Sequence, residues 1–306
     1  MEVIKIYDIK ELEGIRKEFI ETCRRFPEYQ NTEKLKKFVT GGFSAFGNPA
    51  SYHNPLVRKI RKKTYDYVLR TYGREKNVEM FFDRMMLRPN GVAPTKELWH
   101  RDLTPNILKD DIVLGGWTNL DDYPQYFSCV PESHLEKYND TEGFAKIPKK
   151  RYEEMKQRKN KIEIPPGYAI FFHQNTIHEV LGTKGKHDAY RLFHGFRLTK
   201  SNKPLYDVST TIENQGVPRL PSNQIPAMYY AANWMYGTQR AQLINWSNHF
   251  KDVVCERKLL QKEGTYHRVV HQHMKSLKEY GLPMYPSYTE EEKRMFIPTR
   301  LNASVK

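Results

Sequence analysis

The sequence has few cysteines and no long apolar run. Its 306 residues include only Cys23, Cys129 and Cys255. This odd, widely spaced set has no C-x-x-C pair, which argues against a disulfide framework or a cysteine zinc site. Unpaired thiols are typical of a reducing compartment. No apolar stretch approaches the roughly 20 residues of a membrane span, and the first residues lack the basic-then-apolar pattern of a signal peptide. We therefore expect a cytoplasmic protein without a membrane partner.

Internal repeats and low-complexity segments are also absent from the sequence. Hydrophobic residues make up 39% of the chain and charged residues 28%, which is typical of a globular protein that buries a substantial core. We expect one domain over residues 1–200 and a mainly helical extension over residues 201–306 that packs on it. No feature of the sequence predicts an oligomeric state.

Positive charge exceeds negative charge, and the formal net charge is +14. Such an excess is typical of a surface for nucleic acid or another polyanion. The basic residues fall instead in short stretches, such as 58–63 and 149–151, and no long basic tail exists. We favour charge spread over solvated helix faces, which keeps nucleic acid as a less favoured partner.

Two apolar periodicities predict helices in the first quarter of the chain. Apolar residues recur every three or four positions between residues 9 and 23, which predicts an amphipathic helix to about residue 25. A second helix is expected from residue 55 to about residue 72, where Gly73 ends it.

From residue 78 the chain changes to short apolar runs separated by Gly and Pro turns. The expected strands cover residues 78–87, 112–120, 128–131, 161–164, 168–173 and 190–198. Closely spaced short strands of this kind predict an antiparallel sandwich or barrel. The fold class we expect is α+β: a double-stranded β-helix (a jelly-roll or cupin-like barrel) with the N-terminal helices packed on it and a C-terminal helical extension.

Two other segments are expected to be accessory. The lysine-rich stretch at about 136–160 has little apolar periodicity, which predicts an exposed insertion with a short helix. Further helices are expected around residues 228–246, 253–261 and 266–280. His267 and His271 in the last of these lack the acidic residue of an H-E-x-x-H zinc motif. We interpret them as part of a solvated helix face.

The most informative stretch is Trp99-His100-Arg101-Asp102, taken together with the distant His178. An H-x-D pair on a strand and a later histidine are the sequence form of a 2-His-1-carboxylate triad, which leaves open positions on a non-haem Fe(II) ion. Arg191 follows in a strand-like run, where a guanidinium can bind the carboxylate of a co-substrate through two parallel hydrogen bonds. Metal ligands followed by a carboxylate anchor predict an enzyme.

Several motifs in order resemble the phytanoyl-CoA dioxygenase-like Fe(II)/2-oxoglutarate oxygenases, a family that includes ectoine hydroxylase. The resemblance covers roughly residues 78–198. It rests on Arg88-Pro89-Asn90-Gly91, Trp99-His100-Arg101-Asp102, Gly116 to Asp122, Val130-Pro131-Glu132-Ser133-His134, and Gly167 to Phe172 with Asn175 to His178. Each motif alone is weak, whereas five in this order are specific.

The resemblance implies roles for particular residues. His100, Asp102 and His178 would bind Fe(II), and Arg191 would bind the distal carboxylate of 2-oxoglutarate, with O2 as the second co-substrate. Further residues would line the site, namely Met86, Trp117 and Thr118 for 2-oxoglutarate, and Arg84, Trp99 and Arg88 for the substrate. Arg84 as a surface cation and Trp117 as plain core are equally open alternatives, and we interpret His134 as structural.

Two residues depart from the family pattern. Glu132 stands where the family has a glycine, so the turn is expected to take a different backbone shape if that glycine has a positive φ. Tyr168 stands where an aspartate is common. Neither residue is an expected metal ligand.

We therefore expect a dioxygenase that hydroxylates a C–H bond of a small, anionic substrate and releases succinate and CO2. Two alternatives stay open. Arg191 and Arg197 have the R-x5-R spacing of the AlkB-like repair dioxygenases, which favours an oxidative demethylase of nucleic acid. The other alternative is a jelly roll without catalysis, kept as a binding or structural protein.

Overall fold

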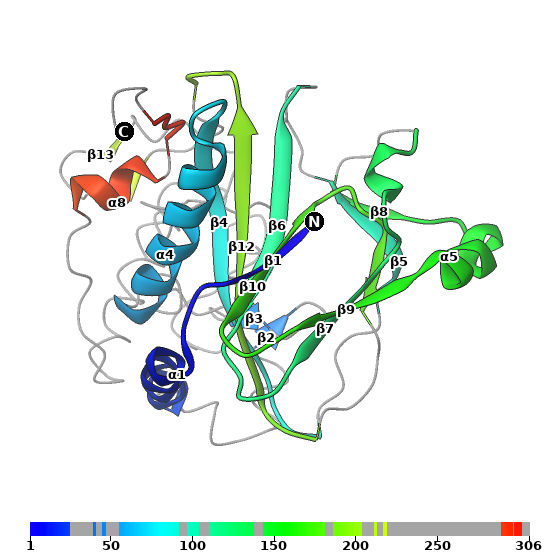
Figure 1. The fold of residues 1–306 in the computed structure, drawn as a ribbon, viewed down its shortest axis with the longest axis horizontal. Helices are drawn as coiled ribbons and strands as arrows, with labels where there is room; N and C mark the ends of the chain where they lie inside the picture. The colour runs from blue at the N-terminus through cyan, green and yellow to red at the C-terminus, as the bar shows by residue number, and fades with distance from the viewer. Residues whose placement is uncertain are drawn as a thin grey trace.

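The protein consists of two antiparallel β-sheets and a set of helices that cover one of them (Figure 1). The computed structural model describes residues 1–24, 39–40, 45–46, 55–91, 97–103, 110–137, 143–180, 186–203, 211–212, 217–218, 289–295 and 297–301. The helices expected between residues 228 and 280, with His267 and His271, lie outside the described residues. Within those residues, no helix combines the length and apolarity that a membrane crossing requires.

The two helices expected near the N-terminus are confirmed. Helix α1 spans Ile9–Arg24 and α4 spans Pro55–Tyr72. A short helix α5 (Tyr152–Arg158) lies in the expected insertion, preceded by a 3-10 turn at Lys149–Arg151. Helix α8 covers Glu290–Arg294, and a second 3-10 turn covers Ser133–Leu135.

The larger sheet has seven strands and the smaller sheet has five. In spatial order, the larger sheet contains β1 (Glu2–Lys5), β10 (Tyr168–His173), β6 (Ile112–Asn119), β12 (Ala189–Thr199), β4 (Asn77–Arg88), β3 (Ala45–Phe46) and β2 (Val39–Thr40). The smaller sheet contains β8 (Gly143–Lys146), β5 (Glu97–Leu103), β11 (His178–Val180), β7 (Gln125–Cys129) and β9 (Asn160–Ile164). A separate hairpin joins β13 (Thr211–Ile212) to β14 (Val217–Pro218).

From β4 to β7, and again from β9 to β12, successive strands alternate between the two sheets. The chain passes from β4 in the larger sheet to β5 in the smaller one, then to β6 and β7, and later from β10 to β11 and β12 in the same manner. This alternation is the strand order of a jelly roll, in which two sheets enclose a shared interior. The metal-ligand motifs fall on β5 and β11, which are neighbours in the smaller sheet.

Helix α4 packs on the outer face of the larger sheet (Figure 1). The apolar cluster between them is fully buried and consists of Tyr65, Val68, Val78, Met80, Leu114, Ala169, Phe171, Phe196, Leu198 and Met295. Because this cluster supports β4, β6, β10 and β12 from behind, their opposite faces are left to form the interior of the jelly roll.

The end of the described chain returns to this core. Met295 lies in the cluster and its carbonyl accepts a hydrogen bond from the backbone N–H of Met80. In α8, Glu292 forms a two-point ion pair with Arg58 of α4, and the N–H of Leu301 donates to the carbonyl of Gly73. The last described residues therefore pack with α4 against the larger sheet.

The sequence patterns missed or shifted several of the smaller sheet's strands. Strand β7 begins at Gln125, earlier than the expected 128–131, and β8 was not expected. These strands are short and only partly apolar, so their pattern is weak. The insertion is also less exposed than expected, because Met155 of α5 is fully buried.

Candidate metal centre

Two strands of the smaller sheet bring three metal-binding side chains together. His100 and Asp102 lie two residues apart on β5 and therefore project to the same face. His178 on β11 lies directly opposite His100 in the antiparallel register. The His100 Nε2 atom is 3.6 Å from Asp102 Oδ1, and the His178 Nε2 atom is 3.6 Å from Asp102 Oδ2. The expectation that these three residues form one cluster is confirmed.

Backbone carbonyls orient both imidazoles. The Nδ1–H of His100 donates to the carbonyl of Leu98 at 2.7 Å, and that of His178 donates to the carbonyl of Thr176 at 2.9 Å. Each carbonyl lies two residues before its histidine. A proton on Nδ1 leaves the Nε2 lone pair for a metal ion, which is the usual arrangement for metal-binding histidines.

The burial of the cluster favours metal binding from one side. His100 and His178 side chains are only 2% and 7% exposed, whereas the Asp102 side chain is 33% exposed. Burial, followed by the nearby His178, lowers the pKa of His100 to about 4, which keeps the imidazole in its neutral, metal-binding form.

The ligand spacing fits one ion. Ligand atoms that each lie about 2.1 Å from a metal are at most about 4.2 Å apart. Both 3.6 Å separations from Asp102 fall within that limit, and all three ligand atoms lie within 4.8 Å of one another. Among the described residues, His100, Asp102 and His178 form a group whose spacing could hold a metal ion. Two imidazoles and one carboxylate suit Fe(II) with open positions.

Arg191 lies inside the jelly roll on β12, with Asn119 of β6 and Met86 of β4 opposite it. It is 8% exposed. Its guanidinium carbon lies 4.3 Å from the centre of the Trp117 ring. The indole Nε1–H of Trp117 is buried and has no hydrogen-bond partner among the described residues. A cation and an unused donor side by side are suited to bind a carboxylate.

Ring contacts connect this pair to the metal cluster. The Trp117 ring contacts Phe127 with centroids 5.5 Å apart, and Phe127 contacts His178 at 5.4 Å. Phe172 also contacts His178, at 5.5 Å. Phe172 ends the Gly167 to Phe172 motif but was given no role from the sequence, and Phe127 belongs to none of the motifs. The signal for Phe127 is a position on the inward face of a strand, which depends on a register that the motifs do not report.

The other expected co-substrate and substrate residues occupy different positions. Met86 is buried opposite Arg191, and Arg88 lies on the same face of β4, partly buried. Burial lowers the pKa of Arg88, although Tyr123 and Asp121 oppose that shift. Arg84 lies in β4 at the register position opposite Phe193, and its side chain is outside the description.

Thr118 does not share the inward face with Trp117. Adjacent residues of a strand point to opposite faces, and Thr118 lies opposite Leu192 and Ala169. Ala169 belongs to the core beneath α4. The expectation that Thr118 borders the co-substrate is therefore corrected: its side chain lies on the helix side of the sheet.

The expectation for Trp99 is corrected for the same reason. As the neighbour of His100 on β5, Trp99 points away from the metal ligands into a second apolar cluster with Val130, Ile147, Met155 and Ile177. Leu98, two residues before His100, takes the inward face instead and is 40% exposed. Strand alternation counted from His100 would have identified it.

Glu132 keeps the turn shape that a glycine favours. Its φ of 60° and ψ of 0° are left-handed. The expectation of a different backbone shape is thus wrong. Glu132 adopts the left-handed conformation although its Cβ makes that conformation unfavourable. His134 in the same turn stacks on His173 with ring centroids 4.3 Å apart, and it is not part of the three-ligand group.

Comparison with known proteins gives distant likenesses only. No family model and no curated protein sequence matches the chain. The chain is similar to the non-heme alpha-ketoglutarate-dependent carbocyclase SnoK from nogalamycin biosynthesis, at 16% identity and a TM-score of 0.47, covering 64% of this chain and 78% of that one. It is also similar to HygX from Streptomyces hygroscopicus with nickel, 2-oxoglutarate and hygromycin B bound, at 14% identity and a TM-score of 0.43, covering 63% and 81%. A third similar structure is EvdO2 from Micromonospora carbonacea, at 13% identity and a TM-score of 0.43, covering 64% and 85%.

At these identities and scores, what the site can do follows from its own residues. His100, Asp102 and His178 form a 2-His-1-carboxylate set, and such a set suits Fe(II) with open positions.

Proposed function

We propose that this protein is a non-haem Fe(II)/2-oxoglutarate-dependent dioxygenase that hydroxylates a C–H bond of a small, anionic substrate. The observation that carries the proposal is the convergence of His100, Asp102 and His178, with both histidines held by their Nδ1–H groups so that Nε2 faces the cluster. A binding module without catalysis needs no such arrangement of one open and two buried ligands.

Each residue of the site has a role in this proposal. The two imidazoles and Asp102 would hold Fe(II), and Asp102 would offset part of its charge. Arg191 and the free Nε1–H of Trp117 would bind the distal carboxylate of 2-oxoglutarate. With both bound, the chemistry supplied is O2 activation, in which one oxygen atom enters succinate, the other enters the substrate C–H bond, and CO2 is released. Phe127 and Phe172 would exclude water from the interior.

A basic residue at the open side of the cluster supports an anionic substrate. Lys146 lies opposite His100 on the edge strand β8 and is exposed. Directly opposite residues of antiparallel strands project to the same face with Cβ atoms about 4.5–5.5 Å apart. The Lys146 ammonium group is thus within reach of a substrate that approaches past Leu98 and Asp102. Arg88 adds a second cation on the inward face of β4.

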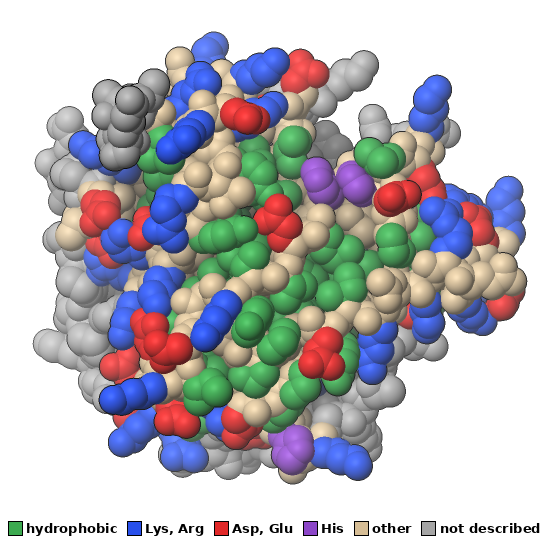
Figure 2. Space-filling view, in the orientation of Figure 1, with side chains coloured by type: hydrophobic (Ala, Val, Ile, Leu, Met, Phe, Trp, Pro, Cys, Tyr) green, Lys and Arg blue, Asp and Glu red, His purple; other side chains and the backbone are tan. Residues whose placement is uncertain are grey.

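The surroundings of Arg197 argue against the nucleic-acid alternative. Arg197, the second arginine of the R-x5-R spacing, is buried and bonded to Asp111 at 2.6 Å and to Glu79 at 2.9 Å. Its guanidinium is therefore occupied. On the face shown in Figure 2, Lys and Arg side chains lie around the rim, interspersed with Asp and Glu, and hydrophobic side chains occupy the centre.

The metal and co-substrate parts of the proposal are tested by anaerobic titration of the apo-protein with Fe(II) and 2-oxoglutarate. We expect a metal-to-ligand charge-transfer absorption band that is lost in His178→Ala and weakened in Arg191→Ala. The exposed His187→Ala serves as a matched control that retains the band. A folded wild-type protein without the band would identify a binding protein instead.

The substrate class is tested by succinate release with pairs of small carboxylic acids and their amides. We expect acids to stimulate turnover more than amides. The Lys146→Gln variant should raise KM for an active acid while leaving the KM for 2-oxoglutarate unchanged. Equal stimulation by acids and amides would overturn the anionic assignment without affecting the metal site.

A further inference from the structure

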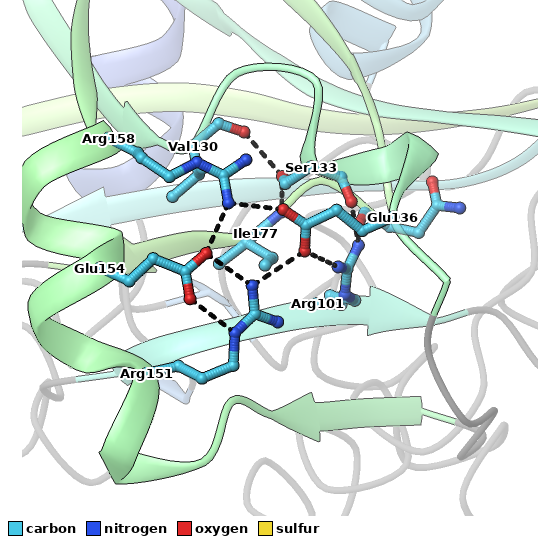
Figure 3. Close-up of polar contacts among 9 residues, drawn as sticks. Arg101, Val130, Ser133, Glu136, Arg151, Glu154, Arg158 and Ile177 are labelled. Atoms are coloured by element: carbon cyan, nitrogen blue, oxygen red, sulfur yellow. Dashed lines mark hydrogen bonds and ion pairs between the residues drawn. The ribbon is translucent and has the colours of Figure 1, made fainter.

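A buried arginine separates the two metal ligands of β5. Arg101 points to the outer face of the strand, away from His100 and Asp102, and is 2% exposed. Its Nη1–H groups donate to the carbonyl of Ser133 at 2.6 Å and to the carbonyl of Asn175. One side chain therefore ties β5 to the turn after β7 and to the loop that leads into His178 (Figure 3).

Ser133 forms a second junction beside Arg101. Its hydroxyl donates to the carbonyl of Val130 at 2.6 Å and accepts the backbone N–H of Ile177 at 2.8 Å. Ile177 directly precedes His178, and the neighbouring Thr176 carbonyl orients the His178 ring. The two junctions thus hold Asn175 and Ile177, the segment directly before His178.

Glu136 connects these junctions to the insertion. Its carboxylate accepts from Arg101 at 3.3 Å, Arg151 at 3.1 Å and Arg158 at 2.7 Å, and Glu154 of α5 binds both Arg151 and Arg158 (Figure 3). Burial raises the pKa of Glu136, but the hydrogen bonds from Arg158 and Arg151 outweigh this, so that the net pKa is lowered. The carboxylate therefore stays charged as the centre of the network.

An apolar cluster completes the contact between the insertion and β5. Trp99, on the same outer face as Arg101, packs against the fully buried Met155 of α5 and against Ile177. Besides the pairing of β8 with β5, the insertion therefore contacts β5 through one apolar and one ionic side chain, and these two residues flank the ligand His100.

We infer that the insertion carrying α5 is a brace that positions the metal ligands, with Arg101, Ser133 and Glu136 as its positioning residues. The inference rests on the proposed metal site and goes beyond it, because none of these three side chains points to the ligand cluster. Groups that orient metal ligands typically change metal affinity by 10- to 100-fold when they are removed.

The variants that test the brace are Glu136→Gln and Ser133→Ala. Glu136→Gln replaces the charged centre of the network with an amide of the same size, and Ser133→Ala removes the bonds to Val130 and Ile177. Glu153→Gln is the matched control, because Glu153 lies on the same helix and forms an exposed pair with Lys156 alone. Arg151→Gln is a milder second variant, because this side chain is 32% exposed and its loss leaves the Arg101–Glu136 pair in place.

Co(II) titration of the apo-protein measures the effect, with the dissociation constant and the ligand-field absorption spectrum at saturation as the two readouts. We expect Glu136→Gln and Ser133→Ala to raise the dissociation constant about 10- to 100-fold and to shift the spectrum, with a smaller rise in Arg151→Gln and none in Glu153→Gln. A spectral shift at full occupancy reports ligand geometry, which a loss of stability alone would leave unchanged.

The outcomes separate the brace from the site itself. If wild-type protein binds Co(II) and all folded variants match its affinity and spectrum, the brace is refuted and the metal site stands. If folded wild-type protein binds no Co(II), the metal site fails and the brace fails with it. If Glu136→Gln or Ser133→Ala does not fold, the Arg151→Gln result decides.

Discussion

His100 and His178 lie directly opposite each other on neighbouring antiparallel strands, with ring centroids 4.2 Å apart. These residues are far apart in sequence, so their rings meet only when β5 and β11 pair. The site therefore does not exist in the unfolded chain, and metal binding is coupled to folding.

Metal should consequently stabilise the folded protein. A ligand that binds only the folded state at 100 times its dissociation constant adds about 2.7 kcal/mol to the free energy of unfolding. We expect Co(II) at that excess to raise the urea midpoint of wild-type protein and of the control His187→Ala, and EDTA to reverse the rise. The His178→Ala variant should show no metal-dependent change in the midpoint, and an equal rise in it would place the metal elsewhere.

Arg191→Lys should weaken 2-oxoglutarate binding without weakening metal binding. Lysine keeps the charge beside Trp117 but cannot make two parallel hydrogen bonds to one carboxylate. The loss of one charge-assisted hydrogen bond costs roughly 1.5–3 kcal/mol, which corresponds to about a 10- to 100-fold higher dissociation constant. Calorimetric titration of Co(II)-loaded protein with 2-oxoglutarate measures it, with the exposed Arg300→Lys as control. An unchanged constant would remove Arg191 from the co-substrate site.

Glu132→Gly should stabilise the protein. The left-handed φ of 60° at Glu132 costs a residue with a Cβ roughly 1–2 kcal/mol in the folded state. Replacement by glycine removes that cost but destabilises the fold by about 0.4–1 kcal/mol, because the unfolded chain gains conformational freedom. The central values give an expected net gain of about 0.8 kcal/mol in the free energy of unfolding, measured by urea denaturation. Glu132→Ala, which keeps the Cβ, is the control and should show no gain.

The metal ligands His100 and Asp102 could be predicted from the sequence because their spacing is local and their chemistry is specific, whereas the distant His178 was predicted from the order of the motifs. His100 and Asp102 occupy alternate positions of one strand, and Arg191 lies in a strand whose apolar pattern is long and clear. The helices α1 and α4 and the long strands β4, β6 and β12 have equally clear periodicity, and they were predicted within one or two residues.

The faces of individual residues were harder to predict. Trp99 and Thr118 were assigned to the site with the family resemblance, and each adjoins a site residue in sequence, yet in a strand an adjacent residue points to the opposite face. The brace was missed for a different reason. Arg101 comes from β5 and Ser133 and Glu136 from the turn after β7, so their contact depends on tertiary packing. A polar insertion also has no periodicity that reports what it packs against.

Trp99→Ala should therefore lower the stability of the fold, whereas Leu98→Ala should mainly change substrate binding. Trp99 is 2% exposed in the cluster beneath α5, and removing a buried tryptophan typically costs about 3–5 kcal/mol. Leu98 lies 40% exposed on the metal face, so Leu98→Ala should cost under about 1 kcal/mol and change KM for the substrate. Urea denaturation and steady-state kinetics measure the two effects. A stable Trp99→Ala protein with altered substrate preference would show that Trp99 lines the substrate site after all.

The buried carboxyl of Asp121 should make the protein less stable as the pH rises. Burial raises its pKa from 3.8 to about 7, although hydrogen bonds from Gln125 and from the Tyr190 backbone N–H oppose the shift. Between pH 4 and pH 7 the folded state therefore holds a proton that the unfolded state has released. The stabilisation is complete below about pH 4 and is lost as the pH rises through 7, by up to roughly 4 kcal/mol.

The variant Asp121→Asn isolates this contribution, because an amide is neutral at every pH. Its Oδ1 can still accept the Tyr190 N–H, whereas its Nδ2 would face the Gln125 amide, which now donates to Asp121 Oδ2. Gln125 must then turn, at a cost that does not depend on pH. We expect the urea midpoint to fall less between pH 5 and pH 7.5 in this variant than in wild-type protein or in the exposed neighbour Asp122→Asn. Equal falls in all three proteins would mean that Asp121 is already ionised at pH 5, because only a carboxyl that keeps its proton in the folded state can produce the difference.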